Sequence, residues 1–250
     1  MGRHGQYRAL VALSAALAAV PAGAGCRLAL ALGFDVSFSV DAEDYAIQTQ
    51  GLIAALGDPG IRMAFLRPAD RVRLAIFEWS GPAVQVTVVP WTEVDSAAAL
   101  DGVVAAIGAH KRAEGHFPTA VGEALDYGLD LLDDQPACAA RTLDLSGDGR
   151  NNTGVGPRRV YADRDWGEVT VNGLAIGGTE SDIVIYYRQE VIRGRGAFVE
   201  PAANFTAFPQ AIRRKLEKEL SEAVVGGDPG PGVGAGVGAG VGAGAEGPAG

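Results

Sequence analysis

The middle of the chain alternates between short apolar runs and amphipathic stretches. Residues 27–35, "RLALALGFD", are almost continuously apolar, which is typical of a strand that is buried on both faces. The next stretch has apolar residues at helical spacing, and Asp41 stands where the N-cap of a helix belongs. Residues 71–80 and 83–91 follow as two strands. Their short "GP" connection predicts a hairpin, so one of the two must run antiparallel.

The rest of this region continues to alternate between helices and strands. The expected helices cover residues 95–108, 119–134, 181–192 and 204–224, and the expected strands cover residues 140–149, 168–177 and 196–201. Thr119 is placed to cap the second of these helices. Strands that are separated by helices predict an α/β fold with a mostly parallel sheet.

The two ends of the chain differ from the middle. Residues 1–25 have two arginines, an apolar stretch and small residues before a potential cleavage site, which together predict a secretory signal peptide. An uncleaved membrane anchor and a lipidated Cys26 are the alternatives. Residues 226–250 are rich in Gly, Ala, Val and Pro and predict a disordered tail. One domain of about 200 residues, 26–225, lies between these ends.

The net charge of the chain without its signal peptide indicates which classes of partner are unfavourable. Without the two signal arginines, 19 basic residues face 30 acidic ones, a net charge of about −11. Such a balance argues against a nucleic-acid partner, because phosphates require a basic surface. Residues 26–225 contain no long apolar stretch, so we expect no membrane span there. We expect a periplasmic or secreted monomer.

Polar side chains follow two of the predicted strands. In an open parallel sheet, the carboxyl ends of the strands form a crevice where the strand order reverses. If strands 27–35 and 140–149 are neighbours there, five oxygen-bearing side chains converge. These are Asp35, Ser37, Ser39, Thr119 and Asp148.

A hard divalent cation suits this set of side chains. Alternate residues of an extended segment face the same way, so Asp35, Ser37 and Ser39 can face one ion. Oxygen ligands favour Mg²⁺, with Mn²⁺ or Ca²⁺ as alternatives. The absence of Cys and His from the set disfavours zinc and copper. Hydroxyl ligands are neutral and leave the ion ready to accept an anion.

The alternative interpretation of Asp35, Ser37 and Ser39 is a turn that caps the next helix, although Asp41 already serves as that cap. In the second motif, "SGDGRNN", the residues other than Asp148 are expected to form the loop or to support the ligands. These residues include Gly149, Asn151 and Asn152.

Together these motifs resemble a known site. The segments "DVSFSV" and "SGDGRNN", with a threonine between them, resemble the metal-ion-dependent adhesion site of von Willebrand factor A domains. A closer resemblance, carried by "DLSGDGRNN", "VNGLAIGG", "YYRQEVI" and "GAFVEPA", is to an uncharacterised bacterial family of secreted proteins in that superfamily. The resemblance covers roughly residues 27–222.

The resemblance implies a doubly wound, Rossmann-like fold. Its six-stranded sheet has the order 3-2-1-4-5-6, one antiparallel edge strand and helices on both faces. It also implies that the five residues named above are metal ligands. The sequence departs from the family in two places. Pro118 stands where the family has a glycine-rich segment before the threonine, which predicts a displaced loop. Residues 154–167 are a poor helix where such a domain usually has one.

The two cysteines allow an independent test of the strand pairing. Cys26 lies nine residues before Asp35, and Cys138 lies ten residues before Asp148. If the two strands are adjacent and parallel, both cysteines lie at their amino ends in nearly the same register. Neighbouring strands are spaced closely enough for a disulfide, so we expect a Cys26–Cys138 bond.

These observations favour a binding module over an enzyme. We expect an exported domain that uses Mg²⁺ to bind an exposed Asp or Glu of a protein partner. One alternative is a phosphatase-like Mg²⁺-dependent hydrolase with Asp35 as nucleophile, although Ser37 stands where such a site requires a second carboxylate. The other alternative is a structural domain whose metal site has degenerated, as the Pro118 departure suggests.

Overall fold

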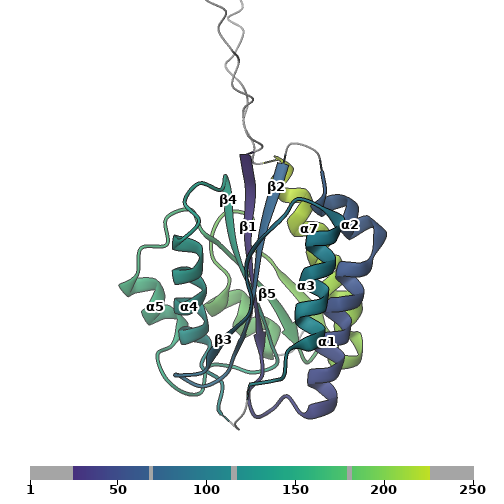
Figure 1. Ribbon diagram of the computed structural model, residues 1–250. Helices are drawn as coiled ribbons and strands as arrows, with labels where there is room; N and C mark the ends of the chain where they lie inside the picture. Colours follow the sequence, from purple (N-terminus) through teal and green to yellow (C-terminus); the bar gives the residue numbers. More distant parts are fainter. Residues whose placement is uncertain (1–24, 68–69, 114–116, 179–181, 226–250) are drawn as a thin grey trace, which may run out of the picture.

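The computed structural model describes residues 25–67, 70–113, 117–178 and 182–225. In this part of the chain a central sheet lies between two layers of helices (Figure 1). The predicted tail and all but the last residue of the predicted signal peptide lie outside the described residues.

The sheet has six strands. They are β1 (Gly25–Asp35), β2 (Asp70–Trp79), β3 (Gln85–Val94), β4 (Ala140–Gly147), β5 (Thr170–Ile176) and β6 (Val199–Ala202). Their order is β3-β2-β1-β4-β5-β6, and only the pairing of β3 with β2 is antiparallel. The predicted α/β fold, strand order and antiparallel edge strand are therefore confirmed. The strand order reverses between β1 and β4, so the crevice of the sheet lies there.

Helices cover both faces of the sheet (Figure 1). One layer contains α1 (Ala42–Gly57), α2 (Pro59–Phe65), α3 (Ala97–Ala109) and α7 (Phe208–Val225), with the short 3₁₀ turn η2 (Phe205–Ala207) before α7. The other layer contains α4 (Val121–Asp133), α5 (Pro157–Asp163), α6 (Asp182–Tyr186) and the π-helical turn η1 (Tyr187–Val191).

The apolar run of β1 lies at the centre of this arrangement. Leu28, Leu30 and Leu32 pack into the core on the α1 side. Ala29 and Ala31 pack into the core on the α4 side. Both faces of the strand are thus removed from water, which explains why its sequence does not alternate with polar residues.

Side-chain caps set the starts of α1 and α2 in the first layer. Asp41 accepts hydrogen bonds from the backbone N–H groups of Glu43 and Asp44, so α1 begins as predicted. Asp58 caps α2 in the same way, with Pro59 at the first helical position. The sequence pattern did not predict α2, although an Asp–Pro pair is a normal helix start.

Three local predictions need correction. The helix predicted for residues 119–134 begins at Val121, and its N-cap residue is Ala120, so Thr119 does not cap it. The helix predicted for 181–192 is one helical turn that continues as a π-helical turn. Residues 157–163, within the stretch described as a poor helix, form a short helix, α5. Among the described residues, no helix has the length and apolar character needed to cross a membrane.

A disulfide joins the amino ends of β1 and β4. Cys26 and Cys138 are bonded, with their Cα atoms 4.5 Å apart, which confirms the predicted pair. The strands then run in parallel register until Phe34 lies opposite Ser146. The bond and the register fix where the two strands end, and their polar turns therefore meet at the opposite edge. The Sγ atom of Cys26 is used in this bond and cannot also carry a lipid.

Candidate metal centre

The five predicted oxygen-bearing residues meet at the carboxyl edge of the sheet. Figure 1 shows this edge of the sheet at the bottom. Thr119 Oγ1 donates to Ser37 Oγ at 3.2 Å, and the Ser37 and Ser39 Oγ atoms are 3.3 Å apart. Ser39 Oγ donates to Asp148 Oδ1 at 2.7 Å. The fifth residue, Asp35, joins through its Oδ1, which accepts from the Ser37 N–H at 2.7 Å. We call these five residues the cluster.

The first loop of the cluster is residues 36–41, between β1 and α1. Hydrogen bonds at Asp35 and at the next residue hold its start in place. The Val36 N–H donates to the carbonyl of Trp79 at 2.9 Å, which extends the pairing of β1 with β2 by one residue. The Gln48 amide donates to the carbonyl of Asp35 at 3.2 Å. A tight turn follows, in which the Val40 N–H donates to the carbonyl of Ser37. The loop is therefore a defined turn.

Thr119 is held by the second loop of the cluster, residues 148–156, between β4 and α5. Its N–H donates to Asn152 Oδ1, and the Asn152 N–H donates to the carbonyl of Thr119, both at 2.9 Å. Gly149 approaches so closely that a Cβ there would lie 3.1 Å from Thr119 Oγ1. The displacement predicted from Pro118 is wrong, because Thr119 lies within the cluster.

The start of α4 is capped by the same loop. Asn151 Oδ1 accepts from the Gly122 N–H at 3.1 Å, and the Ala120 N–H donates to the carbonyl of Ser80 at 2.8 Å. A Cβ on Gly122 would lie 1.9 Å from the carbonyl oxygen of Val155, so only glycine fits there. These contacts leave the Thr119 hydroxyl free of a capping role and available to Ser37.

Asp35 is in an unfavourable environment for a lone carboxylate. The residue is completely buried, and its Oδ2 has no hydrogen-bond partner among the described residues. Burial, and after it the nearby Asp148 carboxylate, raises the pKa of Asp35 to about 7. Burial also raises the pKa of Asp148. A divalent cation would offset both effects, because it supplies positive charge and a partner for the buried oxygen.

The donor set fits a hard cation that accepts neutral ligands. Within the described residues, no group of three or more His, Cys, Asp or Glu side chains is arranged to hold a metal ion. A cation at this edge would therefore rest on two carboxylates and three hydroxyls. Such a set suits Mg²⁺, Mn²⁺ or Ca²⁺.

A comparison with known protein families identifies the family of this chain. A family model described as "Protein of unknown function (DUF1194)" matches residues 25–224. The chain belongs to this family. The match runs from the first residue of β1 almost to the end of α7, so it includes both loops of the cluster. No curated protein matches the DUF1194 chain in sequence.

Several solved structures share the fold of the DUF1194 chain. PilB minor pilin from Streptococcus sanguinis is 14% identical over 84% of this chain and 65% of the pilin, with a TM-score of 0.59. Proximal thread matrix protein 1 from the mussel byssus, with a zinc-occupied MIDAS motif, is 13% identical over 79% and 46%, with a TM-score of 0.56. The von Willebrand factor type A structure from Catenulispora acidiphila is 16% identical over 79% and 43%, with a TM-score of 0.55.

The match spans less than half the length of the mussel and Catenulispora proteins. At these identities the similarity concerns the fold. The predicted resemblance of the DUF1194 chain to von Willebrand factor A domains is confirmed at that level.

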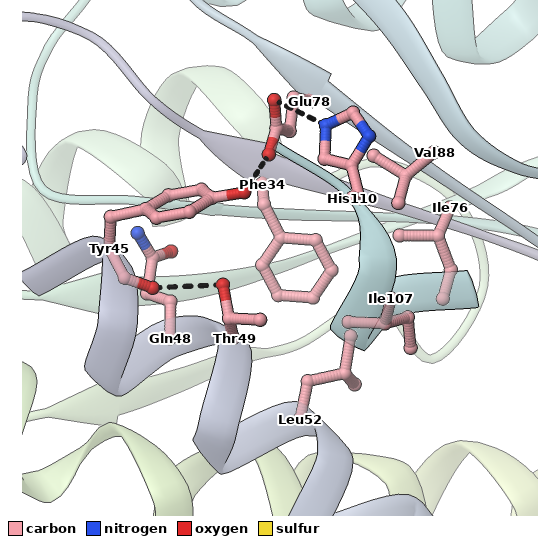
Figure 2. A pocket seen from close by; sticks show the side chains of 10 residues that line it. All are labelled: Phe34, Tyr45, Gln48, Thr49, Leu52, Ile76, Glu78, Val88, Ile107 and His110. Atoms are coloured by element: carbon pink, nitrogen blue, oxygen red, sulfur yellow. Dashed lines mark hydrogen bonds and ion pairs between the residues drawn. The ribbon is translucent and has the colours of Figure 1, made fainter. Parts of the chain in front are cut away.

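Sequence reasoning missed a polar junction beside the cluster. The Nε2 atom of His110 lies 3.1 Å from Glu78 Oε2, and the His110 side chain is only 19% exposed. Glu78 also accepts a hydrogen bond from Tyr45 (Figure 2). Arg112, two residues after His110, contacts the backbone of the first loop. No spacing rule connects these residues, and only the folded chain brings them together. His116, three residues before Thr119 in the sequence, lies outside the described residues.

Proposed function

We propose that this chain is an exported binding module that holds an acidic group of a protein partner through a divalent cation. Asp35 and Asp148 would supply carboxylate oxygens, and Ser37, Ser39 and Thr119 would supply neutral hydroxyls. The observation that carries this proposal is the line of hydroxyls between Thr119 and Asp148, next to a buried carboxylate oxygen that has no partner. When bound, the cation supplies a positive centre with coordination capacity left for an anion.

The surface beside the cluster suits a protein partner. Phe38, between the two serines, is 71% exposed, and Phe117, two residues before Thr119, is 38% exposed. The Phe38 N–H donates to the carbonyl of Phe117 at 2.9 Å, so their backbones are adjacent. Exposed aromatic side chains beside a site typically contribute apolar contact area to a binding surface. A protein segment could place its acid on the cation and an apolar side chain on these rings.

Two observations support export. The disulfide between Cys26 and Cys138 is typical of oxidising compartments. The fold is shared with a pilin and with a matrix protein of the mussel byssus. We place the protein outside the cytoplasm, in the periplasm or secreted.

Mg²⁺ is the cation that the oxygen donors favour, and Mn²⁺ and Ca²⁺ are its natural substitutes. The mussel protein shows that a MIDAS motif can hold zinc. Zinc therefore belongs in the test, although the five donors here include no sulfur or imidazole nitrogen.

Calorimetric titration of each ion into the metal-free protein tests the cation site. We expect saturable Mg²⁺ binding to wild type and none to Asp148→Ala. Asp95→Ala is the matched control, because Asp95 is an exposed acid just after Val94, which pairs with Val72 near the amino end of β2. Absence of binding by wild type for all four ions would contradict the proposal, and so would undiminished binding by Asp148→Ala.

Affinity capture from exported proteins tests the partner. Immobilised wild type should retain the same protein in repeated experiments with Mg²⁺, and release it with a chelator. Asp148→Ala should not retain it. Retention that is insensitive to the chelator would separate partner binding from the cation and would contradict this mechanism.

A further inference from the structure

Arg112 contacts the first loop of the cluster from behind, through the loop backbone. Its guanidinium donates hydrogen bonds to four carbonyl oxygens: Val36 at 2.9 Å, Ser37 at 3.3 Å, Val40 at 2.7 Å and Asp41 at 3.1 Å. These residues span the whole turn between β1 and α1. One side chain therefore determines where four backbone dipoles of the loop point.

The chemistry of this contact requires an arginine. A guanidinium is planar and carries five N–H donors in a fixed arrangement, so it can serve several acceptors at once. A lysine ammonium is a compact charge with three donors and cannot span four carbonyls in the same way. The Ser37 and Asp41 carbonyls also accept from the N–H groups of Val40 and Tyr45, so loss of the guanidinium would remove the donor that holds the carbonyls of Val36 and Val40.

The arginine is itself fixed in place. Its guanidinium lies over the Tyr45 ring, 5.4 Å from the ring centroid. The buried Glu78 at the end of β2 accepts from Tyr45 Oη at 2.6 Å and from the Ala113 N–H at 2.9 Å. Figure 2 shows Glu78 between Tyr45 and His110. Glu78 thus anchors both the ring that Arg112 covers and the residue that follows Arg112.

We propose that Arg112 is a positioning residue for the cation, an inference that rests on the proposed function. Ser37 carries the connection, since its carbonyl accepts from Arg112 while its hydroxyl contacts Thr119 and Ser39. Arg112 holds the loop backbone so that the serine hydroxyls are already in place when the ion arrives. Preorganised ligands cost less to order on binding, and outer contacts of this kind typically change metal affinity 10–100-fold.

The test compares Mg²⁺ affinity with stability. Arg112→Gln should weaken Mg²⁺ binding by about tenfold or more, measured by calorimetry well below the Tm. Arg112→Lys, which keeps the charge, should recover only part of the loss. The control is Arg62→Gln. Arg62 also donates to a backbone carbonyl, that of Ala97, and pairs with Asp101 between α2 and α3, remote from the cluster. The Arg62→Gln variant should have a lower Tm and an unchanged Mg²⁺ affinity.

The sign of the change separates this role from a simple charge effect. A guanidinium that acted only through its charge would repel the cation, so Arg112→Gln would then bind Mg²⁺ more tightly. Tighter binding, or affinity within twofold of wild type, would overturn the positioning role and leave the proposed function standing. If Arg112→Gln does not fold, full wild-type affinity in Arg112→Lys would overturn it as well. Failure of wild type to bind any ion would overturn both.

Discussion

Replacing Asp35 by asparagine should change how the stability of the metal-free protein depends on pH. The pKa of this buried carboxyl is about 7 in the folded protein, against 3.8 for an ordinary aspartate. Below pH 3.8 both the folded and the unfolded chain carry the proton, and the contribution of Asp35 to stability is complete. As the pH rises, the unfolded chain ionises first, so the contribution is lost until the pH passes about 7. The full loss is about 4 kcal/mol, from 1.36 kcal/mol for each pH unit.

The Asp35→Asn variant lacks this titration. Its Oδ1 can still accept from the Ser37 N–H, as Asp35 Oδ1 does at 2.7 Å. The free energy of unfolding of the variant minus that of wild type should therefore rise between pH 4 and pH 8 by up to about 4 kcal/mol. Any constant cost of the new amide group shifts this difference equally at every pH.

Urea denaturation in the presence of a chelator, at one-unit steps of pH, measures this difference. A difference that stays constant between pH 4 and pH 8 would refute the environment assigned to Asp35. Repeating the series with saturating Mg²⁺ should lower this difference at pH 8, because only wild type gains stability from the ion.

Three further variants test other parts of the structure. Lys215→Met should destabilise the fold by about 3–5 kcal/mol, because this buried lysine pairs with two buried carboxylates; an unchanged urea midpoint would contradict the pairing. The double variant Cys26→Ser/Cys138→Ser should lose about 5 kcal/mol of unfolding free energy, since the bond closes a loop with a sequence separation of 112. An equal thermal midpoint of wild type under reducing and non-reducing conditions would argue against this. Gly147→Ala should weaken Mg²⁺ binding in calorimetry, because a Cβ there would lie 2.6 Å from Tyr187 Oη and 3.0 Å from a carboxylate oxygen of the cluster; wild-type affinity would show that the site can adapt.

The general architecture could be predicted because its signals are local. The uninterrupted apolar run of β1 is what a strand buried on both faces requires. The Gly-Pro connection between β2 and β3 permits only a hairpin. The order of the strands came from the resemblance, and the two cysteines supplied an independent test of it. The disulfide and the β1–β4 register agree with each other in the folded chain.

The convergence of the five cluster residues was predictable from the pairing of β1 with β4. Parallel neighbours end at one edge, so Asp35 and Asp148 had to be close once β1 and β4 were adjacent. The role of Thr119 was not predictable in detail. A threonine before a helix is normally expected to cap it, but here Asn151 of another loop supplies that contact.

Contacts made by long side chains across the fold could not be predicted. Arg112 reaches the carbonyls of the first loop from more than seventy positions along the chain. Lys215 pairs with Asp144 inside the core, although its sequence context reads as a charged, solvated helix face. Neither residue has a periodic or motif signal, because the partners are set by the packing of α3 and α7 against the sheet.

A crystal of the protein soaked in Mn²⁺ would show whether the cluster binds a divalent cation, because the anomalous scattering of manganese locates the ion independently of the protein density. We expect one strong peak within coordination distance of the Ser37, Ser39 and Thr119 hydroxyls and the Asp148 carboxylate, and no such peak in Asp148→Ala. A fully ordered cluster with no peak, or a peak only elsewhere on the molecule, would show that the five residues do not form a cation site.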